Sequence, residues 1–349
     1  MEYIVNNSLD PYFNLSLEEY LFRLENNNTY FLLWQNSSSV IIGKNQNAFN
    51  EVDLDFIKTN GIKLARRITG GGAVYHDSGN LNFTFITPSN HKKEYDFIQF
   101  TDQINRALKL FSIDAEYSGR NDLLIDGKKI SGSAQLVGKT KIIHHGTLLF
   151  SSDLEKIEKC LTPSKEKLNA HGVSSVKSRV TAISKHLPEK ISLLEFKDKL
   201  AKEILKNYEN VNIRELTEDE VFIINKLRTE KFSTNEWIYG TSSVSSTSSA
   251  AQEIASIDPA PLFNYSKSLR IENCGLINID MIIKSGIIDS CKISGDFFGS
   301  GDISELEHLL KNKTFTCESV LFALESIDIK YYFNNLSLNN FLQLFDFEF

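Results

Sequence analysis

The chain has 349 residues, of which 41% are hydrophobic and 24% charged, and its formal net charge at pH 7 is −7. This composition is typical of a folded globular protein, and the length is sufficient for one large domain and a smaller one. The acidic charge argues against a nucleic-acid partner, which needs a basic surface, and no apolar run reaches the roughly 18 residues of a membrane span.

Short strands and helices alternate irregularly over the first 110 residues. Apolar runs and periodicity predict strands at 2–5, 30–34, 40–42 and 63–68 and helices at 14–22 and 53–59. Leu81–Ile86 alternates with period two, as a half-buried strand does. Apolar residues at three- and four-residue spacing from Phe97 to Phe111 predict an amphipathic helix.

Two hairpins follow this helix. Residues 121–130 contain Asp126-Gly127, which favours a type I′ turn. Residues 131–137 and 141–150 form a second strand pair that turns at Gly138. Strands outnumber helices and the regular alternation of a parallel sheet is missing, so we predict an α+β fold of mixed, largely antiparallel sheets with flanking helices.

The second half of the chain contains a change in composition. Residues 163–180 are polar and predict a long loop, and a capping box at Thr217 and Glu220 predicts the start of a helix. The serine-rich run that begins at Thr241 predicts a flexible linker. We therefore expect a catalytic domain at 1–240, a linker or insert at 241–262 and a small α+β domain at 263–349.

Four cysteines, Cys160, Cys274, Cys291 and Cys317, show neither CxxC spacing nor a metal-ligand pattern. The N-terminus shows no signal-like apolar segment. We therefore expect reduced thiols in a cytoplasmic protein.

The arginine pair Arg66-Arg67 and the glycines Gly70–Gly72 are candidates for a phosphate seat. Glycine permits positive φ, so that successive backbone N–H groups can converge on an anion, and arginine adds a fork of donors. The spacing is neither GxGxxG nor a P-loop. A tight turn with solvated arginines is the alternative interpretation.

Two further segments carry possible chemistry. Lys128-Lys129 follows the Asp-Gly turn, where a lysine is usually solvated. His144-His145 lies in a predicted strand, where histidine more often packs than binds metal, and no third ligand has zinc-like spacing.

Taken jointly, these motifs resemble the lipoate–protein ligase family. The resemblance rests on RRITGGGAVYHD at 66–77, GRND at 119–122, KKISGSA at 128–134, HHGTLL at 144–149 and SVKSRV at 175–180. Residues 295–299 with 302–307 resemble the accessory domain of the bacterial ligases. The serine-rich segment departs from the family pattern.

The resemblance implies a biotin/lipoate ligase-like fold and a two-step reaction. ATP would activate lipoate, or octanoate, as an acyl-adenylate, and a lysine of a lipoyl domain would then attack it. Lys129 would be catalytic, bridging the acyl group and the α-phosphate, with no certain metal ligand and Mg²⁺ carried by the ATP phosphates. The residues that would bind ATP or lipoyl-AMP are Arg67, Gly71, Gly72, Ala73, Val74, Tyr75, Asn121, Asp122, Lys129, His145, Gly146, Ser178 and Arg179.

The implied acceptors are lipoyl domains of 2-oxoacid dehydrogenase complexes or the glycine cleavage H protein. Basic residues Arg66, Arg67, Lys128, Lys139 and Lys141 are candidates for a local rim that receives the acceptor. The motifs do not distinguish lipoate, octanoate and lipoamide as donors. A cysteine-dependent transferase of the same fold and a non-catalytic binding module are the rivals, and a biotin ligase is more distant.

Overall fold

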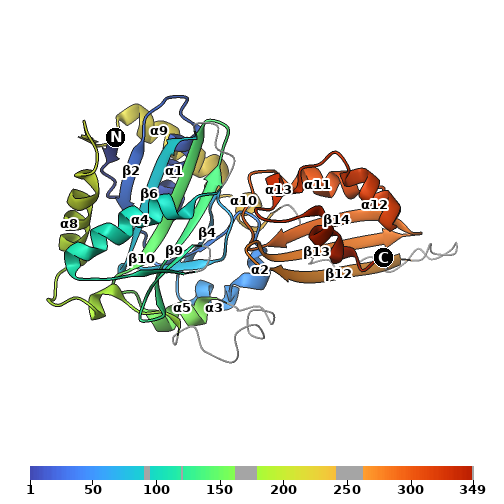
Figure 1. The fold of residues 1–349 in the computed structure, drawn as a ribbon, viewed down its shortest axis with the longest axis horizontal. Helices are drawn as coiled ribbons and strands as arrows, with labels where there is room; N and C mark the ends of the chain where they lie inside the picture. The colour runs from blue at the N-terminus through green and yellow to red at the C-terminus, as the bar shows by residue number, and fades with distance from the viewer. Residues whose placement is uncertain (90–94, 119–120, 162–178, 241–261, 348–349) are drawn as a thin grey trace. The chain divides into compact units, whose positions relative to one another are not determined.

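The computed structural model describes residues 1–89, 95–118, 121–161, 179–240 and 262–347. Its chain divides into two compact units (Figure 1). The first comprises 1–44, 48–69 and 73–238, and the second comprises 239–349 together with 45–47 and 70–72. The expected linker at 241–262 lies almost wholly outside the described residues.

An eight-stranded sheet forms the centre of the first unit, in the order β11-β1-β2-β6-β10-β9-β8-β7. Its strands are β1 (Glu2–Ile4), β2 (Tyr30–Trp34), β6 (Asn80–Pro88), β7 (Glu116–Ser118), β8 (Asp122–Ile125), β9 (Lys128–Val137), β10 (Lys141–Leu149) and β11 (Asn212–Arg214). Strand β1 runs parallel to its two neighbours, and the other pairs are antiparallel.

A smaller sheet in the first unit has the order β4-β3-β5. It contains β3 (Ser39–Ile42), β4 (Lys63–Arg66) and β5 (Val74–His76). The helices of this unit are α1 (Pro11–Arg23), α2 (Ala48–Glu51), α3 (Leu54–Thr59), α4 (Phe97–Leu108), α5 (Leu154–Cys160), α8 (Leu193–Leu205), α9 (Glu218–Leu227) and α10 (Asn235–Tyr239). The predicted mixed α+β class is confirmed.

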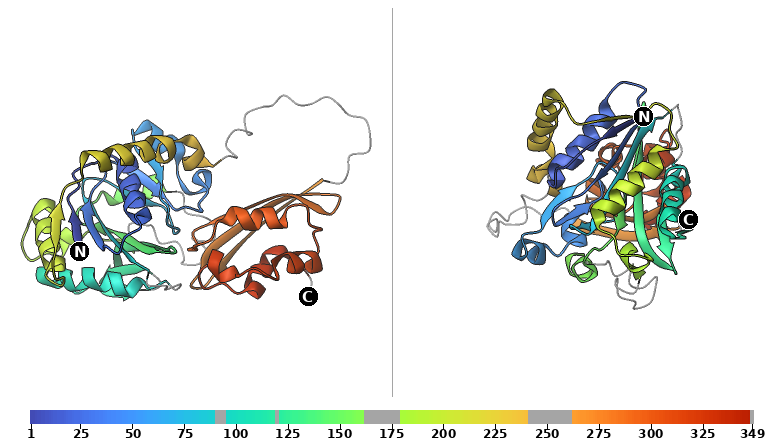
Figure 2. Two further views of the ribbon diagram at one scale, coloured as in Figure 1. Left: turned by 90° about the horizontal axis from the view of Figure 1, so that it is seen from above. Right: turned by 90° about the vertical axis from the view of Figure 1, so that its left-hand side faces the viewer.

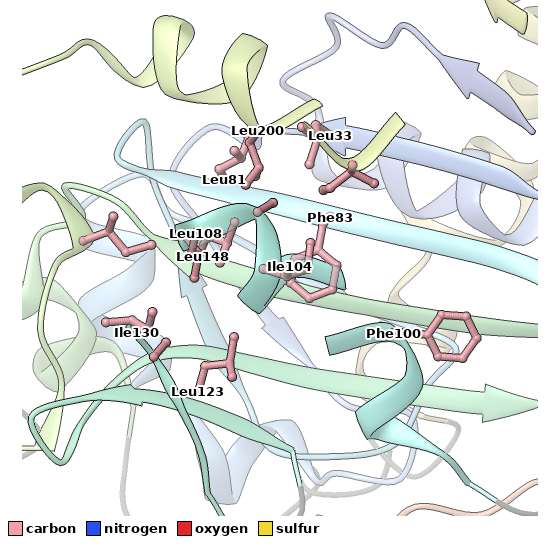
Figure 3. Close-up of a cluster of buried hydrophobic side chains, with 14 of the residues drawn as sticks. Leu33, Leu81, Phe83, Phe100, Ile104, Leu108, Leu123, Ile130, Leu148 and Leu200 are labelled. Atoms are coloured by element: carbon pink, nitrogen blue, oxygen red, sulfur yellow. The ribbon is translucent and has the colours of Figure 1, made fainter. Parts of the chain in front are cut away.

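Helices α4 and α8 cover one face of the large sheet, as Figures 1 and 2 show. Phe100 and Ile104 of α4 and Leu200 of α8 pack there against apolar side chains of the sheet, among them Phe83 (Figure 3). Helix α1 packs on the opposite face, where Leu17 and its neighbours meet residues of β2, β3 and β4. The sheet is thus buried on both sides.

Local sequence signals account for several of these elements. Asp126 (φ 49°) and Gly127 (φ 71°) both have positive φ, which confirms the predicted type I′ turn between β8 and β9. The predicted capping box is present at α9, where Thr217 and Glu220 cap each other's backbone N–H groups.

The second unit is a three-stranded antiparallel meander with helices. Strands β12 (Leu262–Ile271), β13 (Gly275–Lys284) and β14 (Ile287–Gly295) are followed by α11 (Ile303–Leu310), α12 (Cys317–Leu324), α13 (Ile329–Tyr332) and α14 (Leu338–Leu342). Phe297, Phe333, Phe341 and Phe345 are buried in its core. In the described part of the chain, no helix is long and apolar enough to cross a membrane.

Candidate active site

Strand β6 separates an apolar face of the sheet from a polar one. Leu81, Phe83 and Phe85 point into the core under α4 and α8 (Figure 3 shows the first two). Asn82 and Thr84 point to the other face, yet they are 1% and 0% exposed. The prediction of a half-buried strand was therefore wrong, because the polar face is covered by protein rather than by water.

A row of residues crosses five strands on this polar face. Trp34 of β2 pairs with Asn82 of β6, and Asn82 pairs with Thr147 of β10. The Thr147 hydroxyl lies 3.4 Å from the Gly132 backbone nitrogen of β9, and Gly132 pairs with Asp122 of β8. Cross-strand partners share a face of a sheet, so this row leads from an indole to a carboxylate.

Lys129 joins this row through a β-bulge. Leu123 pairs with Ser131, but Leu124 pairs with Lys129, so Ile130 is the extra residue. Residues three apart in a regular strand face opposite sides, and the bulge instead brings Lys129 onto the face of Gly132. The Lys129 Nζ lies 2.7 Å from Asp122 Oδ1, with the two side chains 35% and 30% exposed.

A second row contains a chain of buried hydrogen bonds. Thr84 Oγ1 donates to Glu18 Oε1 at 2.6 Å, and His145 Nδ1 contacts the same oxygen at 2.8 Å. A carboxylate only accepts, so His145 Nδ1 carries a proton. The Nε2 of His145 lies 2.8 Å from the Thr69 hydroxyl.

Arg67 completes this chain, since its Nε donates to Thr69 Oγ1 at 3.0 Å and its Nη1 to the Ile41 carbonyl at 3.1 Å. Burial lowers the pKa of Arg67 to about 10, partly offset by the charge of Glu18. The chain fixes the residue before the glycine turn. Glu18 was not among the predicted site residues, and its contact with His145 in the structure places it in this chain of hydrogen bonds.

The expected basic rim is wrong for three of its five members. Arg66, Arg67 and Lys141 are 6%, 6% and 0% exposed. Arg66 donates to the carbonyls of Gly43, Lys44, Trp237 and Ile238. Lys141 donates to Asn26 Oδ1 and the Asn28 carbonyl. The sequence suggested solvation because it does not show which carbonyls surround these cations.

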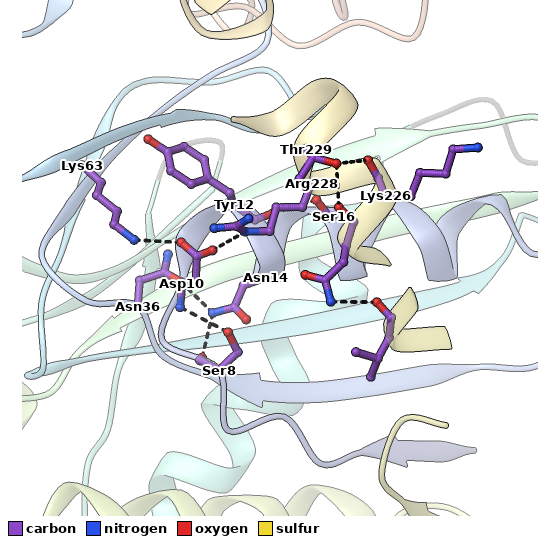
Figure 4. A network of polar contacts seen from close by, with 12 residues as sticks. Ser8, Asp10, Tyr12, Asn14, Ser16, Asn36, Lys63, Lys226, Arg228 and Thr229 are labelled. Atoms are coloured by element: carbon purple, nitrogen blue, oxygen red, sulfur yellow. Dashed lines mark hydrogen bonds and ion pairs between the residues drawn. The ribbon is translucent and has the colours of Figure 1, made fainter. Parts of the chain in front are cut away.

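A polar network at the start of α1 contains Asn14 and Asn36 (Figure 4) and continues to His76. Asn14 Nδ2 donates to Asn36 Oδ1 at 2.8 Å, which orients the Asn36 amide so that its Nδ2 donates to His76 Nδ1 at 3.0 Å. The His76 proton is therefore on Nε2. In the same region, the Asp10 carboxylate forms ion pairs with Lys63 Nζ at 2.9 Å and with Arg228 Nε at 2.5 Å.

The other predicted residues belong to the glycine turn and to strands of the first unit. Gly71 has a φ of 93°, and a Cβ on Gly72 would meet no atom within 4 Å. Val74 and Tyr75 lie on β5, directly after Ala73. The Asn121 amide donates to the Ser133 carbonyl at 2.5 Å, and Gly146 makes room for the Phe83 ring. Ser178 and most of the expected loop at 163–180 lie outside the described residues, but the segment after Arg179 pairs Val180 with Lys129.

Two buried histidines predict acid sensitivity. Burial lowers the pKa of His76 and of His144 to about 3. Between pH about 6.5 and 3 the unfolded chain therefore binds protons that the folded chain does not. As the pH is lowered through this range, the free energy of unfolding decreases by up to about 1.4 kcal/mol per pH unit for each histidine. Urea unfolding followed by tryptophan fluorescence reports this unit alone, because Trp34 and Trp237 both belong to it.

The matched variant is His144→Leu, since His144 stacks on Phe100 at 4.9 Å in the core. It should reduce the slope of unfolding free energy against pH by the equivalent of one proton. A slope that is zero in the wild type, or unchanged in the variant, would contradict the assignment.

No group of three or more His, Cys, Asp or Glu side chains is arranged to hold a metal ion within the residues the structure describes. Among the described residues, this polar sheet face carries the Lys129 ammonium, which is paired with the Asp122 carboxylate. Such a cation can offset the charge that develops between a carboxylate and a phosphate.

The chain matches two family models. Residues 10–205 match the lipoyl protein ligase A/B catalytic domain, and residues 260–345 match the bacterial lipoate protein ligase C-terminus. Lipoate-protein ligase LplJ of Bacillus subtilis is 38% identical over 348 residues, which cover 99% of each chain.

Three solved structures are similar. The Plasmodium falciparum LipL1 structure with lipoate has a TM-score of 0.74 and 25% identity, covering 98% of this chain and 97% of that one. The ligase of a bi-partite Thermoplasma acidophilum lipoylation system, described with its E2 lipoyl domain, has a TM-score of 0.60 and 30% identity. The match covers 68% of this chain and 95% of that one. A lipoate-protein ligase A bound with ATP has a TM-score of 0.57 and 28% identity, and the match covers 68% of this chain and 98% of that one. The chain belongs to the lipoate–protein ligase family.

Proposed function

We propose that the protein joins lipoate, or octanoate, to a lysine of a lipoyl domain in two ATP-dependent steps. An oxygen of the substrate carboxylate attacks the α-phosphorus of ATP, which forms the acyl-adenylate and releases pyrophosphate. The ε-amine of the acceptor lysine then attacks the acyl carbonyl carbon, which forms the amide and releases AMP. The family membership and the relatives with bound lipoate and bound ATP support both substrates.

The observation that carries this proposal is the position of Lys129. Its ammonium lies on the polar sheet face beside Asp122, in line with Thr147 and Asn82. A carboxylate and a polyphosphate repel each other, so a fixed cation between them stabilises the transition state. Lys129 bridges the acyl oxygen and the α-phosphate.

The other site residues hold the nucleotide and the adenylate. The backbone from Gly71 to Tyr75 follows Thr69, which the buried chain of hydrogen bonds fixes. Arg67 has only 6% exposure, so its contribution is a positive charge behind this turn. The full set is Arg67, Gly71, Gly72, Ala73, Val74, Tyr75, Asn121, Asp122, Lys129, His145, Gly146, Ser178 and Arg179.

Mg²⁺ enters with the ATP phosphates. It needs only one or two carboxylates from a protein because phosphates and waters complete its shell. The Asp122 carboxylate is 30% exposed and lies on the same face, so the residues present fit such an ion. Mg²⁺ would screen the phosphate charge.

The acceptor is a lipoyl domain, as in the archaeal lipoylation system, and we include the glycine cleavage H protein among the candidates. We place the reaction in the cytoplasm, which the four free cysteines support. Residues 1–240 carry the catalytic site and residues 263–349 form an accessory domain. The two separate family matches support this division.

The test is ATP–pyrophosphate exchange with and without lipoate, followed by mass spectrometry of an acceptor lipoyl domain. We expect exchange only with lipoate, and a mass increase of one lipoyl amide on the acceptor. Exchange in the absence of any acyl substrate, or modification of the acceptor without ATP, would contradict the two-step ligase.

A cysteine-dependent transferase is the second candidate, and the thiols disfavour it. Burial raises the pKa of Cys160 to about 11 and that of Cys291 to about 12, whereas a nucleophilic cysteine needs a lowered pKa. Cys160→Ala should keep the wild-type rate of lipoate-dependent exchange within about twofold, because Cys160 is the only cysteine before residue 241. Complete loss of acceptor modification in that folded variant would revive the transferase.

A further inference from the structure

The backbone conformation at Gly132 does not require a glycine. Its φ is not in the positive range that the structure records for other glycines such as Gly127, so any residue could adopt this backbone. A Cβ at Gly132, however, would lie 2.7 Å from Lys129 Nζ and 2.8 Å from Lys129 Cε. Real Cβ contacts are longer than this, so the flexible end of the Lys129 side chain must shift from its position if residue 132 carries a side chain.

The space above Gly132 also lies next to the Asp122 carboxylate, which pairs with Lys129. The same Cβ would lie 3.5 Å from Asp122 Oδ1, the atom that Lys129 Nζ contacts at 2.7 Å. The lysine therefore lies along its own strand, over a residue without a side chain, with its ammonium at the carboxylate of the neighbouring strand.

The backbone of Lys129 is held from both sides. Leu124 of β8 is its partner across the bulge. On its other edge, Val180 forms a parallel bridge to it, and the Thr181 N–H donates to the Lys129 carbonyl at 3.0 Å. Since the backbone is fixed, the direction of the side chain depends on the space above Gly132 and on Asp122.

We propose that Gly132 and Asp122 are positioning residues for Lys129: the missing side chain of Gly132 provides the space for the lysine, and Asp122 holds its ammonium before substrates bind. The consequence for the reaction rests on the proposed role of Lys129 as the activating cation. Asp122 then acts through Lys129 rather than only by contact with the nucleotide.

The test compares Gly132→Ala with the matched variant Ser133→Ala. Ser133 is the next residue of β9, is buried, and pairs with Gly146, which faces the Phe83 ring on the opposite side of the sheet. We expect Gly132→Ala to lower kcat for lipoate-dependent exchange about 100-fold, as a misplacement of about 1 Å does. Ser133→Ala should remain within about twofold, and both melting temperatures should stay close to that of the wild type.

A readout in the ligand-free protein separates positioning from loss of substrate space. The Lys129 ammonium signal in ¹⁵N spectra of lysine side chains, assigned with Lys129→Arg, should be protected from exchange in the wild type and in Ser133→Ala. It should be lost in Gly132→Ala and in the second variant Asp122→Asn.

An unchanged signal in either of those variants overturns the proposal, even if Gly132→Ala is inactive, because the glycine would then serve the substrate and not the lysine. Full activity of Gly132→Ala also overturns it. Failure of the proposed function gives a different result from failure of the positioning proposal. In that case Lys129→Ala would be fully active, while the Lys129 ammonium signal of the wild type would still be lost in Gly132→Ala.

Discussion

Replacement of Lys129 by alanine is expected to lower lipoate-dependent ATP–pyrophosphate exchange by at least about 1000-fold, the upper end of what one lost electrostatic donor costs. The fold should remain intact, because the Lys129 side chain is 35% exposed and its one described ion pair is with the partly exposed Asp122. The measurement is the exchange rate at saturating ATP and lipoate, together with the unfolding midpoint by tryptophan fluorescence.

The matched control for this variant is Lys128→Ala. Lys128 precedes Lys129 on the same hairpin, is exposed, and pairs with Ile125 at the start of β9. It carries the same charge but lies outside the bulge that turns Lys129 onto the polar face, so its loss should change exchange less than about threefold. Equal losses in both variants would mean that the general basic charge of the hairpin, and not the position of Lys129, drives the reaction.

Replacement of Arg66 by alanine is expected to destabilise the first unit by about 2–4 kcal/mol, because its guanidinium is the described donor to four carbonyls from two distant segments and a buried acceptor left unsatisfied costs about 1–3 kcal/mol. Two of these carbonyls, those of Trp237 and Ile238, belong to α10. The Trp237 indole in turn donates to the Arg66 backbone carbonyl at 2.8 Å, a bond that the variant keeps, whereas the Trp237 carbonyl loses its guanidinium donor.

The measurement is urea unfolding by tryptophan fluorescence, with a shift of the Trp237 emission expected in the folded variant. Arg66→Lys should fall between the wild type and Arg66→Ala, because an ammonium lacks the planar fork that reaches both segments. Arg23→Ala is the control, since Arg23 is 64% exposed and pairs with Glu19 on the same helix, an interaction worth less than about 1 kcal/mol. Similar losses for Arg23→Ala and Arg66→Ala would refute this role of Arg66.

Local patterns identified most elements of the first unit because each signal acts within a few residues. The Asp126-Gly127 turn and the capping box at Thr217 follow from the conformational preferences of those residues and from hydrogen bonds to the adjacent backbone. The apolar spacing from Phe97 onward gave α4 for the same reason. The family resemblance supplied the candidate site residues, since its motifs are contiguous in the sequence.

What the sequence by itself determined was the mixed α+β class, the position of most strands and helices, and the family, while Lys129 as the catalytic residue stays a prediction. The tertiary structure alone decided which members of each motif face the site. His144 packs in the core and His145 joins Glu18 and Thr69. Arg66 and Lys141 are buried rather than solvated, and a single extra residue turns Lys129 onto the face of Gly132. The physical reason is that burial, hydrogen-bond partners and the face of a bulged strand depend on segments far apart in the chain.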